Sequence, residues 1–176
     1  QMVWRRSSPS SEGSWNAALG RADPTTTSQQ DRALASTTPI TYREILPHDF
    51  NKARRLLQEQ APNEWNHLPD SEIEGELGAV TDGRGSAVVA VADDDVVGYC
   101  VFLYREFVNP EAHRYARTER AGQIGNVAVH SGWRKRGIGR GVVNRSLELL
   151  GERGTKEVFI ERHEQNEPIA VLLART

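Results

Sequence analysis

The residues best suited to chemistry lie in one segment, where glycines and cations follow a short apolar run. It reads Val127-Ala128-Val129-His130-Ser131-Gly132-Trp133-Arg134-Lys135-Arg136-Gly137-Ile138-Gly139-Arg140-Gly141. A strand passes into a basic turn, and the turn opens a helix. The first N–H groups of a helix have no partners within it, and the helix dipole adds positive charge there. The segment therefore predicts a binding site for a phosphate or pyrophosphate group.

Three glycines and four cations suit this turn to such a ligand. Without Cβ atoms, Gly137, Gly139 and Gly141 allow the main chain to approach a ligand closely. The cations are Arg134, Lys135, Arg136 and Arg140. A tight turn beside a solvated basic patch would show the same residues, so the segment alone leaves both interpretations open. Its glycine spacing fits neither a P-loop nor the dinucleotide fingerprint G-x-G-x-x-G.

The elements that must position this turn follow from hydrophobic periodicity. Strands are predicted at 40–45, 87–92, 96–104, 123–129 and 158–160. Helices are predicted after a cap at Asp49, after a cap at Asp70 or Ser71, at 137–153 and at 167–175, and a loop at 107–120. The order β-α-α-β-β-β-α-β-α indicates one α/β domain, at 39–176.

Composition excludes several classes of function. Residues 1–38 are rich in Ser, Thr, Pro and Gln, which predicts a flexible N-terminal tail. The net charge of -2 gives no reason to expect nucleic acid or an anionic membrane as a partner. Without a long apolar stretch or a secretory signal, we expect a cytoplasmic protein. The five histidines are scattered, so no metal is expected, and Cys100 lies in an apolar run typical of an inert thiol.

The motif Arg134-Lys135-Arg136-Gly137-Ile138-Gly139 resembles the Arg/Gln-x-x-Gly-x-Gly/Ala motif of GNAT-family N-acetyltransferases. The strand before it, the helix and strand after it, and Asn166 stand in that family's order, and the resemblance covers roughly residues 40 to 176. It implies a mixed, mostly antiparallel twisted sheet flanked by helices. It also implies transfer of acetyl from acetyl-coenzyme A to a primary amine of a small molecule or peptide.

The resemblance assigns roles to individual residues. The implied cofactor-binding residues are Val127, Ala128, Val129, Arg134, Lys135, Arg136, Gly137, Ile138, Gly139, Arg140 and Asn166. N–H groups from Arg136 to Arg140 would hold the pyrophosphate, and the valines would run beside the pantetheine arm. The N–H of Val129 would stabilise the oxyanion, a contact worth about 3 kcal/mol. Asn166 would contact the cofactor arm, cap the last helix, or do both.

The chain departs from the family pattern near its end. Leu173 stands where many members have a tyrosine that protonates the departing thiolate, and the last two strands are missing before Thr176. Those strands complete the sheet and one wall of the acceptor groove, so the strand at Val158 is predicted to be an exposed edge. Three explanations stay open: a truncated product, a second chain that supplies the wall in a homodimer, or a non-catalytic coenzyme A binding or regulatory module.

No general base can be assigned from the sequence. The position where the family commonly has a carboxylate on its fourth strand holds Gln123 or Gly125, and neither is a base. Glu106, His130 and Glu161 are substitutes, but each is explained as well by an ordinary polar residue at a strand end.

Acidic residues are concentrated in the region that lines the acceptor side in the resembled family. Between Leu56 and Asp82 there is no Lys or Arg. The seven acidic residues are Glu59, Glu64, Asp70, Glu72, Glu74, Glu76 and Asp82. They favour a cationic acceptor, such as a polyamine, an aminoglycoside or a lysine side chain, although a solvated helix face explains them too.

Overall fold

The computed structural model describes residues 2–6, 15–17, 38–62, 67–104, 120–160 and 166, with the backbone alone for the first two ranges. Its strands are β1 (Met2–Arg6), β2 (Trp15–Ala17), β3 (Thr41–Glu44), β4 (Gly85–Ala92), β5 (Asp95–Leu103), β6 (Ala121–Val129) and β7 (Glu157–Ile160). Its α-helices are α1 (Phe50–Gln60), α2 (Asp70–Thr81) and α4 (Ile138–Glu152). From β3 to β7 these elements follow the predicted order, whereas β1 and β2 fall in the predicted tail. The predicted helix at 167–175 and nearly all of the predicted loop at 107–120 lie outside the described residues.

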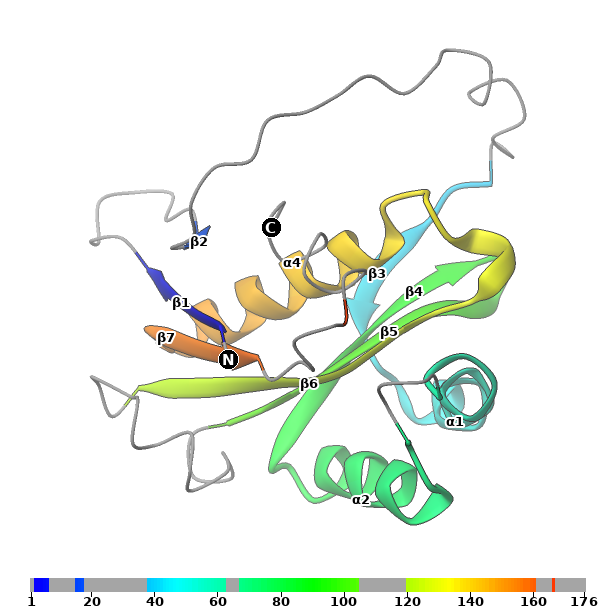
Figure 1. The fold of residues 1–176 in the computed structure, drawn as a ribbon, viewed down its shortest axis with the longest axis horizontal. Coiled ribbons are helices and arrows are strands. Elements are labelled where there is room, and N and C mark those ends of the chain that lie inside the picture. Colours follow the sequence, from blue (N-terminus) through cyan, green and yellow to red (C-terminus); the bar gives the residue numbers. More distant parts are fainter. Residues whose placement is uncertain are drawn as a thin grey trace.

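One sheet forms the centre of the molecule, with the strand order β2-β1-β7-β6-β5-β4-β3. β6 and β7 are parallel and joined through α4, and every other neighbouring pair is antiparallel. α4 covers one face of the sheet, while α1 and α2 lie on the opposite face (Figure 1). The predicted mixed, mostly antiparallel sheet flanked by helices is therefore confirmed.

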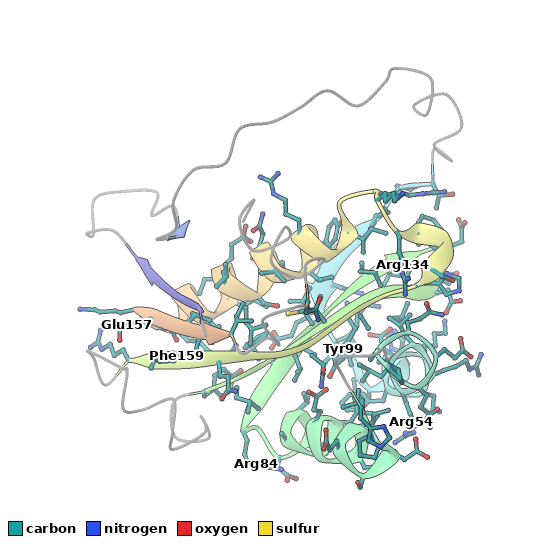
Figure 2. All side chains as sticks on the ribbon, in the orientation of Figure 1. Arg54, Arg84, Tyr99, Arg134, Glu157 and Phe159 are labelled. Carbon is teal, nitrogen blue, oxygen red and sulfur yellow. The ribbon has the colours of Figure 1, made fainter. Side chains whose placement is uncertain are left out.

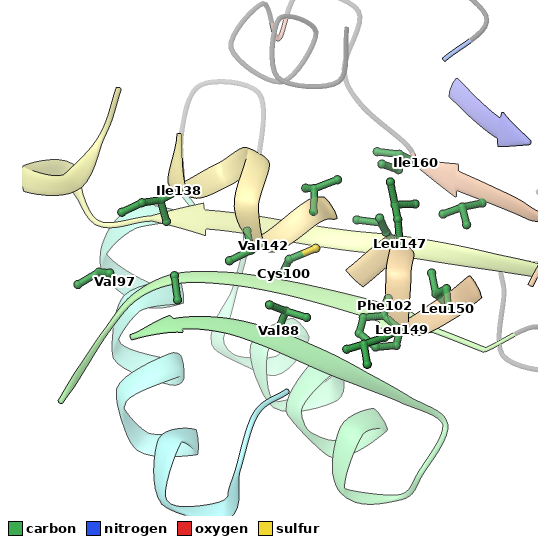
Figure 3. Packing of buried hydrophobic residues seen from close by; sticks show 14 of the residues in the cluster. Val88, Val97, Cys100, Phe102, Ile138, Val142, Leu147, Leu149, Leu150 and Ile160 are labelled. Carbon is green, nitrogen blue, oxygen red and sulfur yellow. The ribbon is translucent and has the colours of Figure 1, made fainter. Parts of the chain in front are cut away.

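Each face of the sheet buries its own hydrophobic core. On one face Val142, Leu147 and Leu150 of α4 pack with Cys100 and Phe102 of β5 (Figure 3). On the other face α1 and α2 contribute side chains that are at most 3% exposed: Leu56, Leu57, Ile73 and Leu77. β4 and β5 lie between the two cores and are buried on both sides, which explains their continuous apolar sequences.

The β4–β5 hairpin turns at two aspartates rather than three. Asp93 and Asp94 have φ angles of 48° and 62°, and Asp95 already belongs to β5. Two consecutive residues with positive φ are typical of the tight turn whose twist matches antiparallel strands. Aspartate tolerates this conformation better than most residues.

The helix caps differ from the prediction. Asp49 stands at the N-cap of α1 but makes no capping bond; it accepts hydrogen bonds from Arg43 at 2.5 and 3.0 Å and from the Leu46 N–H at 2.8 Å. Burial raises the pKa of Asp49, but these bonds outweigh it and hold the pKa below its ordinary value. α2 begins after Pro69 with no side-chain cap, so the predicted cap at Asp70 or Ser71 is wrong.

Part of the segment predicted to be a flexible tail belongs to the sheet. β1 pairs antiparallel with β7, with Trp4 opposite Val158, and β2 pairs with β1. The predicted exposed edge at Val158 is therefore wrong. An unpaired strand presents free N–H and C=O groups along its edge, and β1 satisfies them. The apolar run Met2-Val3-Trp4 is too short to predict such a strand from sequence.

Two glycines let α4 lie close to the sheet. A Cβ atom at Gly141 would stand 2.2 Å from Cε1 of Tyr42 on β3, and one at Gly98 would stand 2.5 Å from Cγ2 of Ile138. Gly141 thus serves packing between elements rather than the close approach of a ligand that the sequence suggested. In the described part of the chain, no helix is both long enough and apolar enough to cross a membrane.

Candidate active site

β6 has an edge that β7 covers only in part. β7 pairs with β6 from Ala121 to Ile124. On its other side β6 pairs with β5 as far as Val129, and the N–H of His130 donates to the Val97 carbonyl at 3.0 Å. Backbone N–H groups alternate along a strand, so those of Val127 and Val129 point away from β5. They face the edge that β7 leaves open.

A β-bulge interrupts β6 just before these valines. Cys100 pairs with Val127 and Phe102 with Ile124, so Gly125 and Asn126 together lie opposite Val101. Gly125 is exposed, and a Cβ atom there would stand 2.7 Å from Cγ1 of Val101. A bulge of this kind bends the strand and redirects its groups, as is common beside active sites.

The turn after β6 is held by side chains from two sides. Nδ1 of His130 accepts a hydrogen bond from the Gly132 N–H at 3.2 Å. Oε1 of Gln60, the last residue of α1, accepts from the Ser131 N–H at 3.0 Å and from Arg134 at 3.4 Å. Figure 2 shows Arg134 in this turn. These bonds fix the approach to α4.

The start of α4 is open toward solvent. Lys135 and Gly137 have positive φ angles of 60° and 80°, which turn the chain into the helix. Gly137 at the N-cap supplies no side-chain cap, and the first turn contains no acidic residue. Orphan N–H groups with positive dipole potential therefore remain for an anion.

Four cationic side chains surround this helix start, and all are exposed: Arg134, Lys135, Arg136 and Arg140. The guanidinium of Arg136 lies 4.7 Å from the ring centroid of Trp133, close enough for a cation–π contact. Ile138 and Gly139 are buried. Because the Ile138 side chain is buried and glycine has none, a ligand here would meet the main chain. The arrangement can hold a doubly charged anion such as a pyrophosphate.

The structure brings most of the predicted site residues together along one continuous path. Val127, Ala128 and Val129 form the end of β6, and the residues from Arg134 to Arg140 form the turn and the first turn of α4. The side chain of Ala128 faces the α1–α2 core, whereas those of Val127 and Val129 pack on the α4 side. Asn166 is partly buried, and its neighbours lie outside the described residues, as do Glu106, Glu161 and Leu173.

Glu76 of α2 is a polar residue at this site that the sequence did not single out. Its Oε1 accepts a hydrogen bond from Nδ2 of Asn126 at 2.7 Å and a long one from the Asn126 N–H at 3.4 Å. Burial raises the pKa of Glu76 above its ordinary value, although the bonds from Asn126 work in the opposite direction. A sequence signal existed: Glu76 follows Ile73 by three residues and so lies on the buried face of the helix.

Two other groups near β6 have defined roles. His130, one of the bases considered from sequence, uses Nδ1 to cap the turn. Burial raises the pKa of the Cys100 thiol to about 12, so the thiol stays protonated near neutral pH and is a poor nucleophile.

A surface hollow of about 660 Å³ lies at the opposite end of β4 and β5 from the turn. Tyr104, Glu44 and Arg153 contribute its polar groups, and Arg153 lies 4.8 Å from the Tyr104 ring centroid. None of the predicted site residues lines it.

Comparisons with solved structures support the fold. The chain is similar to the aminoglycoside N-acetyltransferase AAC(6')-Iy in complex with CoA, at 13% identity over 79% of this chain and 87% of that one, with a TM-score of 0.64. It is similar to the GNAT family N-acetyltransferase YhbS from Escherichia coli in complex with CoA, at 20% identity over 73% and 66%, with a TM-score of 0.55. A ribosomal-protein-alanine N-acetyltransferase from Brucella melitensis shares 22% identity over 76% and 87%, with a TM-score of 0.56.

Comparison with curated proteins by sequence gives no significant match. The model of the acetyltransferase (GNAT) family matches residues 50–173, which is more than half of the chain and includes β6, the basic turn and α4. This protein therefore belongs to the acetyltransferase (GNAT) family.

Proposed function

We propose that this protein transfers the acetyl group of acetyl-coenzyme A to a primary amine, with a cationic small molecule as the acceptor. One observation carries the proposal: the uncapped, cation-lined start of α4 comes one short turn after a strand whose edge β7 covers only in part. A ligand that joins a pyrophosphate to a peptide-like arm matches both features: the pyrophosphate suits the helix start, and the arm suits the strand edge. Family membership supports this choice of ligand.

The pyrophosphate would bind at the beginning of α4. The N–H groups from Arg136 to Arg140 would donate to its oxygens, and the exposed cations Arg134 and Lys135 would add attraction. Charge-assisted bonds of this kind are about twice as strong as neutral ones. Asn166 stays a candidate contact for the arm.

The pantetheine arm would run along the open edge of β6. The N–H groups of Val129 and Val127 face this edge about 7 Å apart, because two residues of a strand span that length. Amide groups of the arm can pair with them as a neighbouring strand would. We propose one of these two N–H groups as the donor to the thioester oxygen: Val129, as the resemblance implies, or Val127, which lies deeper along the edge and next to the bulge. Donors aimed at a developing oxyanion lower the barrier by about 3 kcal/mol.

The region of α1 and α2 that would face the acceptor carries less unpaired negative charge than the sequence suggested. Glu74 is paired with Arg54 at 2.6 Å, Asp70 accepts from Gln58 at 2.9 Å, and Asp82 is paired with Arg84 at 3.3 Å. Glu59 and Glu72 stay exposed, and Glu76 reaches β6. The remaining negative charge still favours a cationic amine. Three of the similar structures are of aminoglycoside acetyltransferases, which is consistent with this class of acceptor.

Calorimetric titration with coenzyme A tests the binding site. Gly139→Asp places bulk and negative charge at the proposed pyrophosphate site, and we expect no measurable binding. Arg136→Ala should weaken binding by about 1 to 3 kcal/mol if its contact is charge-assisted. Arg55→Ala removes an exposed cation from α1 and is the matched control, with unchanged affinity. Normal binding by a folded Gly139→Asp variant would place the site elsewhere.

Thiol release from acetyl-coenzyme A tests the transfer. Spermidine, kanamycin and lysine methyl ester serve as cationic acceptors, and a neutral amide-rich amine of similar size serves as the control. Release that depends on the cationic amines supports the proposal. Coenzyme A binding without any release would instead favour the non-catalytic module, which Leu173 in place of the family's tyrosine also favours.

A further inference from the structure

The carboxylate of Glu76 is fixed against the strand that would hold the thioester. Its Oε1 accepts from Asn126, and a Cβ atom added to Gly125 would stand 3.2 Å from the same oxygen. Glu76 therefore lies at the bulge of β6, immediately before Val127. It comes from α2, whose residues Ile73 and Leu77 anchor that face of the helix in the core.

The second carboxylate oxygen of Glu76 is buried without a partner among the described residues. Oε2 has no hydrogen bond, and neither does the buried hydroxyl of Tyr99 on β5. Tyr99 points from the sheet into the same α1–α2 side of the molecule (Figure 2). A carboxylate has about four acceptor sites, and leaving a buried charged oxygen unsatisfied is unfavourable. An ammonium group, which carries three donors, would give Oε2 the hydrogen bond that it lacks.

The charges around Glu76 leave it without a protein cation in the described part of the chain. On α2 itself, Glu72 carries a like charge and repels Glu76. The titratable groups that β5 brings near Glu76 are Tyr99 and Cys100. α1, which packs on α2, directs Arg54 to Glu74 instead. β6 contributes only the neutral amide of Asn126. A bound ammonium group would supply the positive charge that the described residues do not bring to Glu76.

We propose that Glu76 is the general base of the transfer and receives the ammonium group of the acceptor amine at Oε2. This inference rests on the proposed function and adds to it a residue in direct contact with the acceptor. It also gives a physical reason for a cationic acceptor: a primary ammonium both neutralises the carboxylate and delivers the proton that must leave before attack.

The proton and electron pairs balance as follows in the proposed step. One N–H bond of the ammonium breaks and its proton goes to Oε2, which leaves a lone pair on nitrogen. That pair forms the C–N bond to the acetyl carbon while the C–S bond breaks and its pair stays on sulfur. The second proton of the former amine passes to the thiolate, and Glu76 later returns its proton to solvent.

A purely structural role for Glu76 makes a different prediction. If the carboxylate only tied α2 to β6, the bonds that Oε1 accepts from Asn126 would suffice. Glutamine keeps an acceptor oxygen for that bond and has nearly the same shape, but it cannot accept a proton. Glu76→Gln therefore separates the two roles.

The experiment measures kcat/KM for spermidine, kanamycin and lysine methyl ester from pH 5 to 10 in the wild type and in Glu76→Gln. At pH 7 we expect a loss of about 100-fold or more, the usual size of a general-base contribution. The deficit should shrink as pH approaches the pKa of the amine, because free amine then needs no base. The acidic limb of the wild-type profile, set by the ionisation of Glu76, should be replaced in the variant by a limb that follows the deprotonation of the free amine.

Controls keep the test specific. Glu148→Gln removes an exposed acid from α4, on the opposite face of the sheet, and should change kcat/KM by no more than about twofold. Affinity for coenzyme A should be the same in the wild type and in Glu76→Gln. Equal kcat/KM in the two proteins at pH 7, or a constant deficit at every pH, would overturn the assignment.

The outcomes also separate this inference from the proposed function. In one outcome the wild type binds coenzyme A and acetylates at least one probe while Glu76→Gln is equally active. That result refutes the role of Glu76 and leaves the proposed function standing. A wild type that acetylates none of the probes refutes both.

Discussion

At the scale of single residues, two unpartnered oxygens stand out in an otherwise well-satisfied interior. Other buried polar groups have partners: Asp49 is held by Arg43, and Ser146 donates to the Val142 carbonyl at 2.8 Å. Oε2 of Glu76 and the Tyr99 hydroxyl have none among the described residues. Most buried polar groups in proteins are satisfied, so exceptions call for an explanation. We explain the unpartnered Oε2 as the atom that receives the ammonium group of the acceptor.

The raised pKa of Glu76 has a consequence for stability. A group whose pKa is raised on folding binds protons more tightly in the native state, so the free energy of unfolding falls as pH rises from the ordinary value through the raised pKa. Glu76→Gln removes this dependence and should be at least as stable as the wild type at pH 7. Chemical denaturation across this pH range measures the effect, and a variant markedly less stable than the wild type would argue for a structural role.

Tyr99→Phe tests whether the hydroxyl is unpartnered in the free protein. Removing an unsatisfied hydroxyl from the core should leave the free energy of unfolding unchanged or raise it by about 1 kcal/mol. Ser146→Ala is the comparison, because it removes a hydroxyl that has a bond and should lower stability by about 1 kcal/mol. If urea denaturation showed Tyr99→Phe to be the less stable of the two, the hydroxyl would have a partner.

At the scale of elements, the site depends on how β5 receives the first turn of α4. Gly98 allows Ile138, the first residue of the helix, to lie directly on the strand. Ile138 is 1% exposed and packs with Val142, so its side chain cannot move aside freely. The strand therefore sets the position of the N–H groups that are proposed to hold the pyrophosphate.

Gly98→Ala should disturb both stability and binding. Its Cβ atom would stand 2.5 Å from Cγ2 of Ile138, so the start of α4 must shift, and overpacking of this kind costs about 1 to 3 kcal/mol. We expect a lower Tm and weaker binding of coenzyme A. Gly78→Ala is the control: its Cβ atom meets nothing within 4 Å inside α2, and alanine should stabilise the helix by up to about 1 kcal/mol. Tight binding by a fully stable Gly98→Ala protein would contradict this account of the packing.

Periodicity and turn chemistry predicted most of these elements. The strand–turn–helix around Gly137 and the β4–β5 hairpin are local features, and their bounds are correct to within about two residues. In the sequence Glu76 is only one of the seven acids of its region, because the contact that distinguishes it, with Asn126, joins residues 50 positions apart. The bulge at Gly125 and Asn126 likewise depends on register against β5, which no local pattern shows.

At the scale of the whole molecule, the sheet is wider than the sequence suggested. β1 and β2 extend it past β7, on the side where the resembled family has its last two strands. Main-chain pairing needs little sequence specificity, which explains why a Ser- and Pro-rich segment gave no signal of it. The open edge of β6 and the hollow beside Tyr104 lie toward opposite ends of this sheet.

A crystal structure of the protein with acetyl-coenzyme A tests the central claim most directly. We expect the pyrophosphate on the N–H groups between Arg136 and Arg140, and the arm along the edge of β6 with its thioester near Glu76. The same ligand seated in the hollow between Glu44 and Arg153, with the start of α4 free, would contradict the account.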